Sequence, residues 1–432
     1  MKKTALVLLA ALVALLAMVA LIWQLNLGDE PDPSAPVADL TMTPQLVAQG
    51  AYLARAGNCA ACHTTRGGVP YAGGRGIDTP FGTVYAPNLT PDGATGIGQW
   101  SSSDFWRALH NGRSKSGRFL YPAFPYTSYT AMARADSDAL FAFLKSLPAT
   151  AQAATPHELR WPYKFQAALA VWRALYFRPA AHSAEPAKSA EWNRGAYLVQ
   201  VLGHCGACHS QRNALGADED RLALSGGLMA LQNWYAPALT SLNEAGLANW
   251  QQEDIVRLLQ SGVAPHRTVL GPMADVVLQS TQHLSLEDLA AMATYLKALP
   301  QTTMTLPAQT TVAGNPPTLS RLAVQGAHVY DTHCAQCHGE QGLGVAGAYP
   351  ALAGNRAVRM AVSVNLIQAV LYGGFAPATA GNPRPFGMPP YVLALTDADI
   401  AAVLTYIRTA WGNRGGEVTE LEVSRLRAIS GG

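Results

Sequence analysis

The six cysteines of this 432-residue chain form three pairs, and each pair belongs to a Cys-x-x-Cys-His sequence. The cysteines are Cys59, Cys62, Cys205, Cys208, Cys334 and Cys337, and the histidines that follow them are His63, His209 and His338. Two intervening residues set the sulfurs at the spacing of the two haem vinyl groups, so both thiols can form thioethers. The adjacent histidine supplies the proximal nitrogen to the iron. The pattern predicts three covalently bound haem c groups.

Other chemistries of paired cysteines fit this pattern less well. A zinc site needs four ligands from paired motifs and gives no reason for a histidine at the same offset each time. A thioredoxin-like redox pair lies near a βαβ unit, which the sequence does not indicate. Disulfides are compatible with an exported chain, but three aligned motifs that use every cysteine favour haem attachment.

One methionine in each repeat is a candidate for the second axial ligand of the iron. Met132, Met273 and Met388 each lie between the middle of a repeat and its last helix. A methionine ligand raises the reduction potential relative to a second histidine. The alternatives are core methionines that fill gaps, and His110 or His283 as the ligand in the first or the second repeat.

Two tyrosine–tryptophan pairs are candidates for contacts with the haem propionates. Trp100 follows Tyr85 by the same interval as Trp250 follows Tyr235. Each of these side chains carries one polar group on an apolar body, so it can donate to a carboxylate while packing in a core. The alternative is that all four are ordinary aromatic core residues.

The segments that position these residues recur three times. A Gly-Ala sequence at Gly50, Gly195 and Gly326 predicts a short helix that leads into each motif. Helices are also predicted over 102–109 and 252–259, after the two tryptophans. An amphipathic helix closes each repeat, over 136–147, 285–299 and 396–410. These closing helices carry acidic residues first and basic residues near their ends, which suits the helix dipole.

The N-terminus has the features of an export signal. Lys2 and Lys3 precede an uncharged, largely apolar run that extends to Asn26, long enough to reach the ~20 residues that span a bilayer. No clean cleavage site follows, so we expect an uncleaved anchor, with a removed signal peptide as the alternative. The lysines would place the N-terminus in the cytoplasm and the rest of the chain outside.

The remaining composition excludes little, but it argues against nucleic acid as a partner. Net charge is +2, charged residues make up 13%, and no long basic run occurs. An apolar, aromatic segment over 161–177 is expected to be a helix that docks on the domains, or else a contact with membrane or partner.

These sequences together resemble the cytochrome c subunit family of bacterial membrane-bound dehydrogenases. That family serves quinoprotein alcohol dehydrogenase, flavin-dependent gluconate, sorbitol and fructose dehydrogenases, and some molybdenum aldehyde or N-heterocycle dehydrogenases. The resemblance covers residues 45–413 and rests on CAACH (59–63), YAPNLTPD (85–92), YPAFPYTSYT (121–130), GHCGACHSQRNALG (203–216), GPMADVV (271–277), CAQCHGEQG (334–342) and GMPP (387–390).

The resemblance and the repeats imply a mainly α fold, with three tandem cytochrome c-like domains after an N-terminal signal or anchor. The expected ranges are 1–28 for the signal or anchor, 29–44 for a linker, 45–150 for domain 1, 151–185 for an inter-domain segment, 186–303 for domain 2, 304–317 for a linker, 318–414 for domain 3 and 415–432 for a C-terminal tail. The family also implies His/Met ligation, which pairs His63 with Met132, His209 with Met273, and His338 with Met388.

The family further implies an electron-transfer subunit on the periplasmic side of the cytoplasmic membrane, not an enzyme by itself. It would accept electrons from a dehydrogenase catalytic subunit of quinoprotein, flavoprotein or molybdenum type and pass them to ubiquinone or a terminal oxidase. The alternatives are a peroxidase-like haem enzyme and a stand-alone quinol-to-oxidase shuttle. The segment after Trp411 lacks a long amphipathic tail, so membrane attachment is expected to rest on the N-terminal segment.

Overall fold

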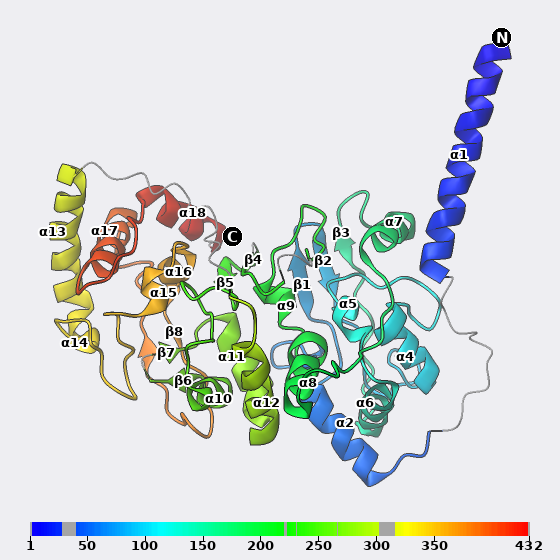
Figure 1. The fold of residues 1–432 in the computed structure, drawn as a ribbon, viewed down its shortest axis with the longest axis horizontal. Coiled ribbons are helices and arrows are strands. Elements are labelled where there is room, and N and C mark those ends of the chain that lie inside the picture. The colour runs from blue at the N-terminus through cyan, green and yellow to red at the C-terminus, as the bar shows by residue number, and fades with distance from the viewer. Residues whose placement is uncertain are drawn as a thin grey trace. The chain divides into compact units, whose positions relative to one another are not determined.

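The computed structural model describes residues 2–27, 40–219, 223–229, 231–265, 267–301 and 316–430, and it is mainly helical (Figure 1). These residues divide into two compact units. The first unit contains the first repeat, with short pieces of the second at Gln200–His204 and Ala214–Ala217. The second unit contains the rest of the second repeat together with the third. The expected linkers at 29–44 and 304–317 fall mostly outside the described residues.

The first unit combines helices with a small antiparallel sheet of strand order β1-β2-β3. Its elements are α1 (Lys2–Leu27), α2 (Pro44–Ala56), α3 (Cys59–His63), β1 (Gly76–Thr79), β2 (Gly82–Tyr85), α4 (Ser102–Asn111), α5 (Tyr126–Tyr129), α6 (Arg134–Ser146), β3 (Glu158–Leu159) and α7 (Gln166–Tyr176).

The elements that follow contain only two-stranded antiparallel pairs, β4 with β5, β6 with β7, and β8 with β9. They are α8 (Ala190–Ala196), η1 (Tyr197–Leu202), α9 (Gly206–His209), β4 (Gly227–Met229), β5 (Trp234–Ala236), α10 (Gln252–Ser261), β6 (Val263–Ala264), β7 (Arg267–Thr268), α11 (Pro272–Gln279), η3 (Thr281–His283), α12 (Leu286–Lys297), α13 (Pro316–His333), α14 (Ala335–His338), α15 (Arg356–Arg359), α16 (Val364–Tyr372), β8 (Gly374–Phe375), β9 (Gly387–Met388), α17 (Asp397–Thr409) and α18 (Glu420–Ser430).

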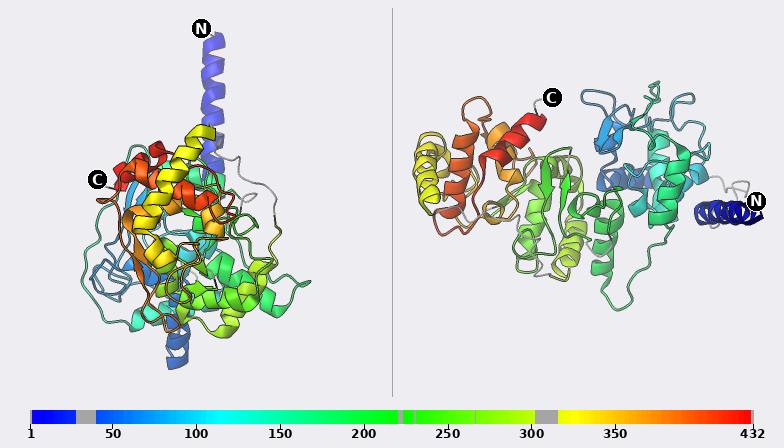
Figure 2. Two further views of the ribbon diagram at one scale, coloured as in Figure 1. Left: turned by 90° about the vertical axis from the view of Figure 1, so that its left-hand side faces the viewer. Right: turned by 90° about the horizontal axis from the view of Figure 1, so that it is seen from above.

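Each repeat is closed by the packing of its first helix against its last. The pairs are α2 with α6, α8 with α12, and α13 with α17, and the last pair lies side by side in both views of Figure 2. A glycine of the first helix meets the backbone of an alanine in the last helix, at Gly50 with Ala139, Gly195 with Ala291, and Gly326 with Ala402. A Cβ atom on any of these glycines would overlap the alanine carbonyl oxygen, so the close crossing requires glycine.

The predicted helices are present, and side-chain caps start two of the closing helices. Ser285 accepts a hydrogen bond from the Asp288 N–H before α12, and Thr396 forms a capping box with Asp399 before α17. Such caps satisfy N–H groups that have no partner within the helix. The predicted ranges 102–109 and 252–259 lie within α4 and α10, which end at the left-handed glycines Gly112 and Gly262.

The apolar segment at 161–177 contains α7, which docks inside the first unit. Arg173 of α7 is 2% exposed, and its guanidinium lies over the rings of Phe119, Tyr126 and Phe177. Its Nε also donates to Oδ1 of Asn26, at the end of α1, over 3.0 Å. The docking interpretation of this segment is therefore confirmed.

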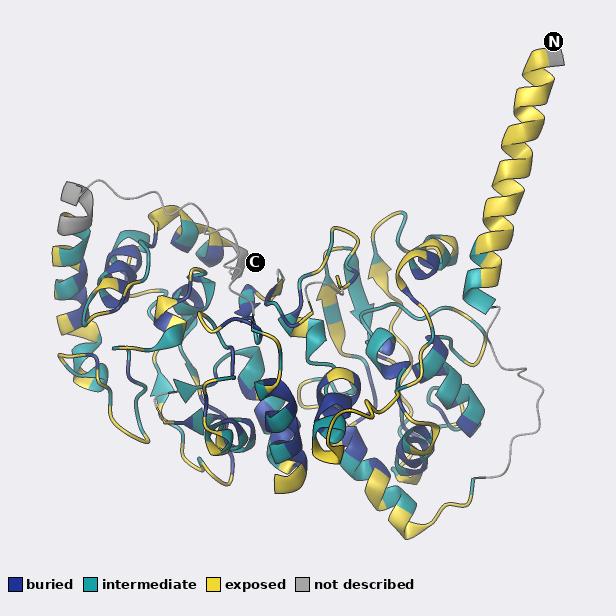
Figure 3. Ribbon diagram, viewed as in Figure 1, coloured by how far each residue is buried: buried dark blue, intermediate teal, exposed yellow. Residues whose placement is uncertain are grey.

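Helix α1 is long and apolar enough to cross a membrane, a property that an anchor and a signal sequence share. Its described residues are exposed along most of its length (Figure 3). Only its last turn is partly covered, where Asn26 Nδ2 donates to the Ala170 carbonyl of α7 over 3.0 Å.

The C-terminal segment is part of the third repeat, so the expectation of a separate tail from residue 415 is wrong. Val418, Val423 and Leu426 are buried in the same hydrophobic core as the residues of α16 and α17. Arg427 fixes this helix further, because its Nε donates to the Asp397 carboxylate over 2.6 Å. In the sequence these apolar residues are separated by polar ones within a short segment, so their pattern did not predict that the segment packs on the domain.

The glycine crossings should be sensitive to a single methyl group. Gly50→Ala forces a Cβ atom against the Ala139 carbonyl, and overpacking of this kind costs about 1–3 kcal/mol. We therefore expect a lower melting temperature by calorimetry. Gly93→Ala is the control, since its Cβ would meet only the Gln99 side chain at 3.4 Å. Equal melting temperatures for the two variants would contradict this account of the crossing.

Candidate haem-binding sites

In all three motifs the histidine ring is held by the carbonyl group of a proline. Nδ1 of His63 lies 2.8 Å from the Pro87 oxygen, His209 lies 2.7 Å from Pro237, and His338 lies 3.0 Å from Pro350. Because a carbonyl oxygen can only accept, Nδ1 carries the proton and donates. Nε2 is then the unprotonated nitrogen, which is the form that ligates a metal.

Electrostatics support the same ring state. Burial lowers the pKa of His63, His209 and His338, although the hydrogen bond to the proline carbonyl partly opposes this shift. Desolvation penalises the imidazolium cation. A neutral imidazole with its proton on Nδ1 is therefore the favoured state at neutral pH.

The cysteines lie in or next to the same short helix as the histidine. Cys59, Cys62 and His63 belong to α3, and positions i, i+3 and i+4 of a helix share one face. The helices α9 and α14 present the other two motifs, each preceded directly by its first cysteine. One helical turn therefore aims two thiols and an imidazole in one direction, which is what thioether attachment and axial ligation together require.

All six cysteines are free thiols, so no disulfide competes for them. Burial raises the pKa of Cys59 to about 12, of Cys205 to about 12 and of Cys334 to about 11. These thiols are protonated at neutral pH, so the proton that addition across a vinyl group requires is present on each of them.

Two arginines support the motif and were not singled out as motif contacts in the sequence. Arg75 Nη1 donates to the carbonyl of Ala61, between the first pair of cysteines, over 2.5 Å. Arg212 Nη2 makes the matching bond to Ala207 over 2.9 Å. Their distances from the motif along the chain differ, so no shared spacing marks these two arginines as a matching pair.

The three candidate methionines lie in different local settings. Met273 is the second residue of α11, and Met388 lies in β9; both are partly buried. Met132 is 3% exposed and lies directly before Ala133, the N-cap of α6. The rival His110 stacks on Trp106 at 4.6 Å, and the rival His283 ends η3.

The two tyrosines that were expected to contact propionates have acidic partners instead. The Tyr235 hydroxyl donates to Glu244 Oε2 over 2.9 Å, and burial together with this carboxylate raises its pKa. Burial, and then the neighbouring Glu158 carboxylate, likewise raise the pKa of Tyr85. A tyrosine has one proton to donate, so the proton of Tyr235 is not available to a propionate.

Trp250, in contrast, has the features of a propionate contact. It is 8% exposed, and among the described residues no group accepts from its buried Nε1. A buried donor without a partner is costly, and a haem carboxylate would satisfy it. Trp100 holds the matching position in the first repeat. The backbone N–H groups of Trp100 and Trp250 each donate to the backbone carbonyl three residues earlier.

Positive charge surrounds Trp250. The guanidinium carbon of Arg267 lies 3.7 Å from the centre of the Trp250 ring, and that of Arg356 lies 5.9 Å away. Burial, and then the like charges of Arg267 and Arg359, lower the pKa of Arg356, while Asp254 offsets part of the charge of Arg267. A bound anion would reduce the repulsion among these positive charges, and the two propionates of a haem are suitable anions.

A cavity of about 380 Å³ continues this cluster. Arg356, Arg359, Arg408 and Arg414 line it, and Glu244 is the one carboxylate among its lining residues. Arg408 is 1% exposed and is held by the carbonyl oxygens of Val358, Met360 and Gly416. The second repeat thus has a donor set that fits a haem with carboxylate groups, partly supplied by the third repeat.

Comparison with known proteins agrees with the motifs. A sequence model of the cytochrome c family matches residues 47–148 and 323–411. The chain is 40% identical to the cytochrome c subunit of alcohol dehydrogenase (quinone) from Gluconacetobacter polyoxogenes, over 88% of this chain and 84% of that protein. It is 39% identical to the gluconate 2-dehydrogenase cytochrome c subunit of Pantoea cypripedii, over 91% and 92%. The fructose dehydrogenase cytochrome subunit of Gluconobacter japonicus is 33% identical, over 88% and 82%.

Removal of one motif should remove one haem. In the double variant Cys205→Ala and Cys208→Ala, the second motif retains no thiol for a thioether. We expect the intact mass of the protein to fall by one haem group, measured after maturation in a host that attaches haem c. Ala207→Ser, between the same cysteines, is the control and should keep the full mass. An unchanged haem content in the double variant would contradict attachment at this motif.

Loss of positive charge beside Trp250 should lower one reduction potential. A cation near a haem favours the reduced iron, so Arg267→Gln should lower the midpoint potential of one haem by about 59 mV, a tenfold change in a one-electron equilibrium. Spectroelectrochemical titration measures this shift. Arg257→Gln removes an equal charge from the exposed face of α10 and should leave every potential in place. Equal shifts in both variants would exclude a specific role of Arg267.

Proposed function

Because this chain belongs to the family of dehydrogenase cytochrome c subunits, we propose that it carries electrons through three haem c groups, one in each of three tandem cytochrome c domains. The observation that carries this proposal is the threefold recurrence of a Cys-x-x-Cys-His turn whose Nδ1 donates to a proline carbonyl. Electrons arrive from the catalytic subunit of a dehydrogenase, which oxidises its substrate on a separate polypeptide.

Each motif has a defined task toward its haem. The two thiols would tether the porphyrin, and the proline carbonyl would orient Nε2 of His63, His209 or His338 for ligation. When bound, the haem supplies a one-electron couple. Met273 and Met388 would be the second protein ligands in the second and third repeats, which would raise the potential. Trp250 and Arg267 would hold a propionate in the second repeat, and Trp100 would do so in the first.

The partner is a dehydrogenase whose substrate the family does not specify, since the relatives named above serve alcohol, gluconate and fructose dehydrogenases. Quinoprotein, flavoprotein and molybdenum catalytic subunits all suit an acceptor of single electrons. From this chain the electrons pass to ubiquinone or to a terminal oxidase.

The chain acts on the periplasmic side of the bacterial cytoplasmic membrane, and α1 holds it there. Its length and hydropathy suit a membrane span. Its last turn contacts α7, where Arg173 donates to Asn26. A cleaved signal has no need of such a contact with the folded domain, which supports retention of α1 in the mature protein.

Purification from mildly solubilised membranes tests the function. We expect the full chain to co-purify with a larger cofactor-bearing subunit, and the substrate of that subunit to reduce all three haems, as followed by their visible absorption. The double variant Cys205→Ala and Cys208→Ala should still co-purify but should transfer fewer electrons per complex. Isolation of the chain alone, reduced directly by quinol, would instead identify a stand-alone shuttle.

A further inference from the structure

The loops that follow α4 in the first repeat and α10 in the second repeat share a backbone hydrogen bond that serves as a landmark. In the first repeat the Leu120 N–H donates to the carbonyl of Gly112, the C-cap of α4, over 2.8 Å. In the second repeat the Val269 N–H donates to the carbonyl of Gly262, the C-cap of α10, over 2.9 Å. Because these two bonds are equivalent, residues of the two loops can be aligned by counting from them.

Counting from this landmark places a phenylalanine where the second repeat has its methionine. Met273 is the fourth residue after Val269, and Phe124 is the fourth residue after Leu120. Phenylalanine has neither a sulfur nor a nitrogen, so it cannot ligate iron.

The third repeat leads to the same residue. Met388 precedes a proline and then Tyr391, whose hydroxyl donates to the carbonyl of His333, beside the motif, over 2.8 Å. Phe124 also precedes a proline, and five residues after it Tyr129 donates its hydroxyl to the carbonyl of Gly57, two residues before Cys59, over 3.0 Å. The Tyr129 ring lies 5.5 Å from the Phe124 ring, so Phe124 packs beside the tyrosine that bonds next to the first motif.

Met132 has a different counterpart in the other repeats. It directly precedes the N-cap of its closing helix, as Leu284 precedes Ser285 and Leu395 precedes Thr396. All three are buried, at 3%, 7% and 7% exposed. An apolar residue before an N-cap commonly packs against the first turns of the helix. Met132 is therefore a core residue that replaces leucine.

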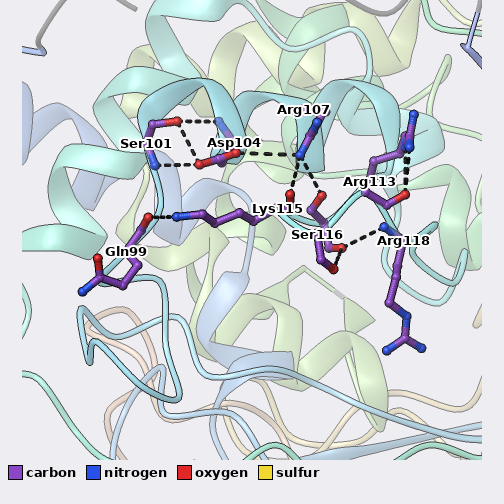
Figure 4. Close-up of polar contacts among 10 residues, drawn as sticks. Gln99, Ser101, Asp104, Arg107, Arg113, Lys115, Ser116 and Arg118 are labelled. Carbon is purple, nitrogen blue, oxygen red and sulfur yellow. Dashed lines mark hydrogen bonds and ion pairs between the residues drawn. The ribbon is translucent and has the colours of Figure 1, made fainter. Parts of the chain in front are cut away.

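Polar contacts hold the loop ahead of Phe124 and oppose a shift in register (Figure 4). Arg107 Nη2 donates to the carbonyls of Ser114 and Lys115, over 3.0 and 2.8 Å. The Lys115 ammonium donates to the carbonyl of Gln99, and the Arg118 N–H donates to Ser114 Oγ over 3.2 Å. Moving Met132 into the place of Phe124 would also require α5 and the Tyr129 hydrogen bond to break.

The candidate ligand His110 lies on α4, where its ring stacks on Trp106. His110 also lies two residues before the C-cap Gly112, where the second repeat has Gln260 before Gly262. In the second repeat we assign the ligand to Met273, and the residue that corresponds to His110 is Gln260. The position of His110 is therefore not the ligand position in that repeat.

We propose that the haem held by His63 has no methionine ligand and that its sixth coordination position, beside Phe124, is open to a small exogenous ligand. The aromatic side chain offers no hydrogen-bond donor and no charge. The position therefore suits a neutral diatomic molecule that binds ferrous iron, such as carbon monoxide or nitric oxide. Without the methionine, this haem has a lower potential than the other two. The inference rests on the proposed haem attachment at His63.

Carbon monoxide titration of the reduced, fully haem-loaded chain tests the proposal. We expect one equivalent of carbon monoxide per three haems, and a methionine-to-iron charge-transfer absorption in the oxidised protein that corresponds to two haems. Phe124→Met should abolish carbon monoxide binding, raise this absorption by half and raise the lowest midpoint potential. Met132→Leu should change none of these quantities.

Matched controls and contradicting outcomes keep the test decisive. Met273→Leu and Met388→Leu are positive controls, since each should add one equivalent of carbon monoxide and halve the charge-transfer absorption. A wild-type chain that binds no carbon monoxide would overturn the proposal, as would loss of charge-transfer absorption in Met132→Leu. Haem content by mass, measured in the same samples, separates either result from a failure of haem attachment itself.

Discussion

The hydrogen bond from a histidine Nδ1 to a proline carbonyl is the interaction on which the rest of the structure depends. It fixes the proton on one ring nitrogen and leaves the other to the iron, in each of three sites. The helical turn of the motif then places both thiols on the same side as the imidazole. The glycine crossings of the first and last helices hold this turn in place, because only a residue without a side chain lets the two backbones meet.

Around this shared frame the three sites differ in their distal and electrostatic surroundings. The second site has a buried tryptophan donor and several arginines, of which Arg356 comes from the third repeat and also bonds to the Gly246 carbonyl over 2.8 Å. The third has Met388 on a short strand. In the first, we infer that Phe124 stands at the position of the methionine. Since the ligand and the nearby charges set the potential of a haem, one repeated frame can hold three carriers of different potential.

Much of the fold and the proximal half of the site followed from local sequence. The spacing of apolar residues and the charges at the helix ends predicted α4, α10 and the three closing helices, because residues three and four apart lie on the same face of a helix. Other parts did not follow. The docking of α18 depends on a few apolar residues, among them Val418 and Val423, that only a folded α16 and α17 make into a core. The pairing of Tyr235 with Glu244 joins residues whose proximity depends on the turn between them.

The sequence by itself determined the three Cys-x-x-Cys-His motifs, since each consists of five consecutive residues. Only the tertiary structure showed that Met132 and Met273 lie at different places in their repeats. Loop lengths differ among the repeats, so a methionine near the right place in the sequence is not evidence of its place in space. Backbone hydrogen bonds to Gly112 and Gly262, and the N-caps of the closing helices, set that register, and they separate Met132 from Met273 and Met388.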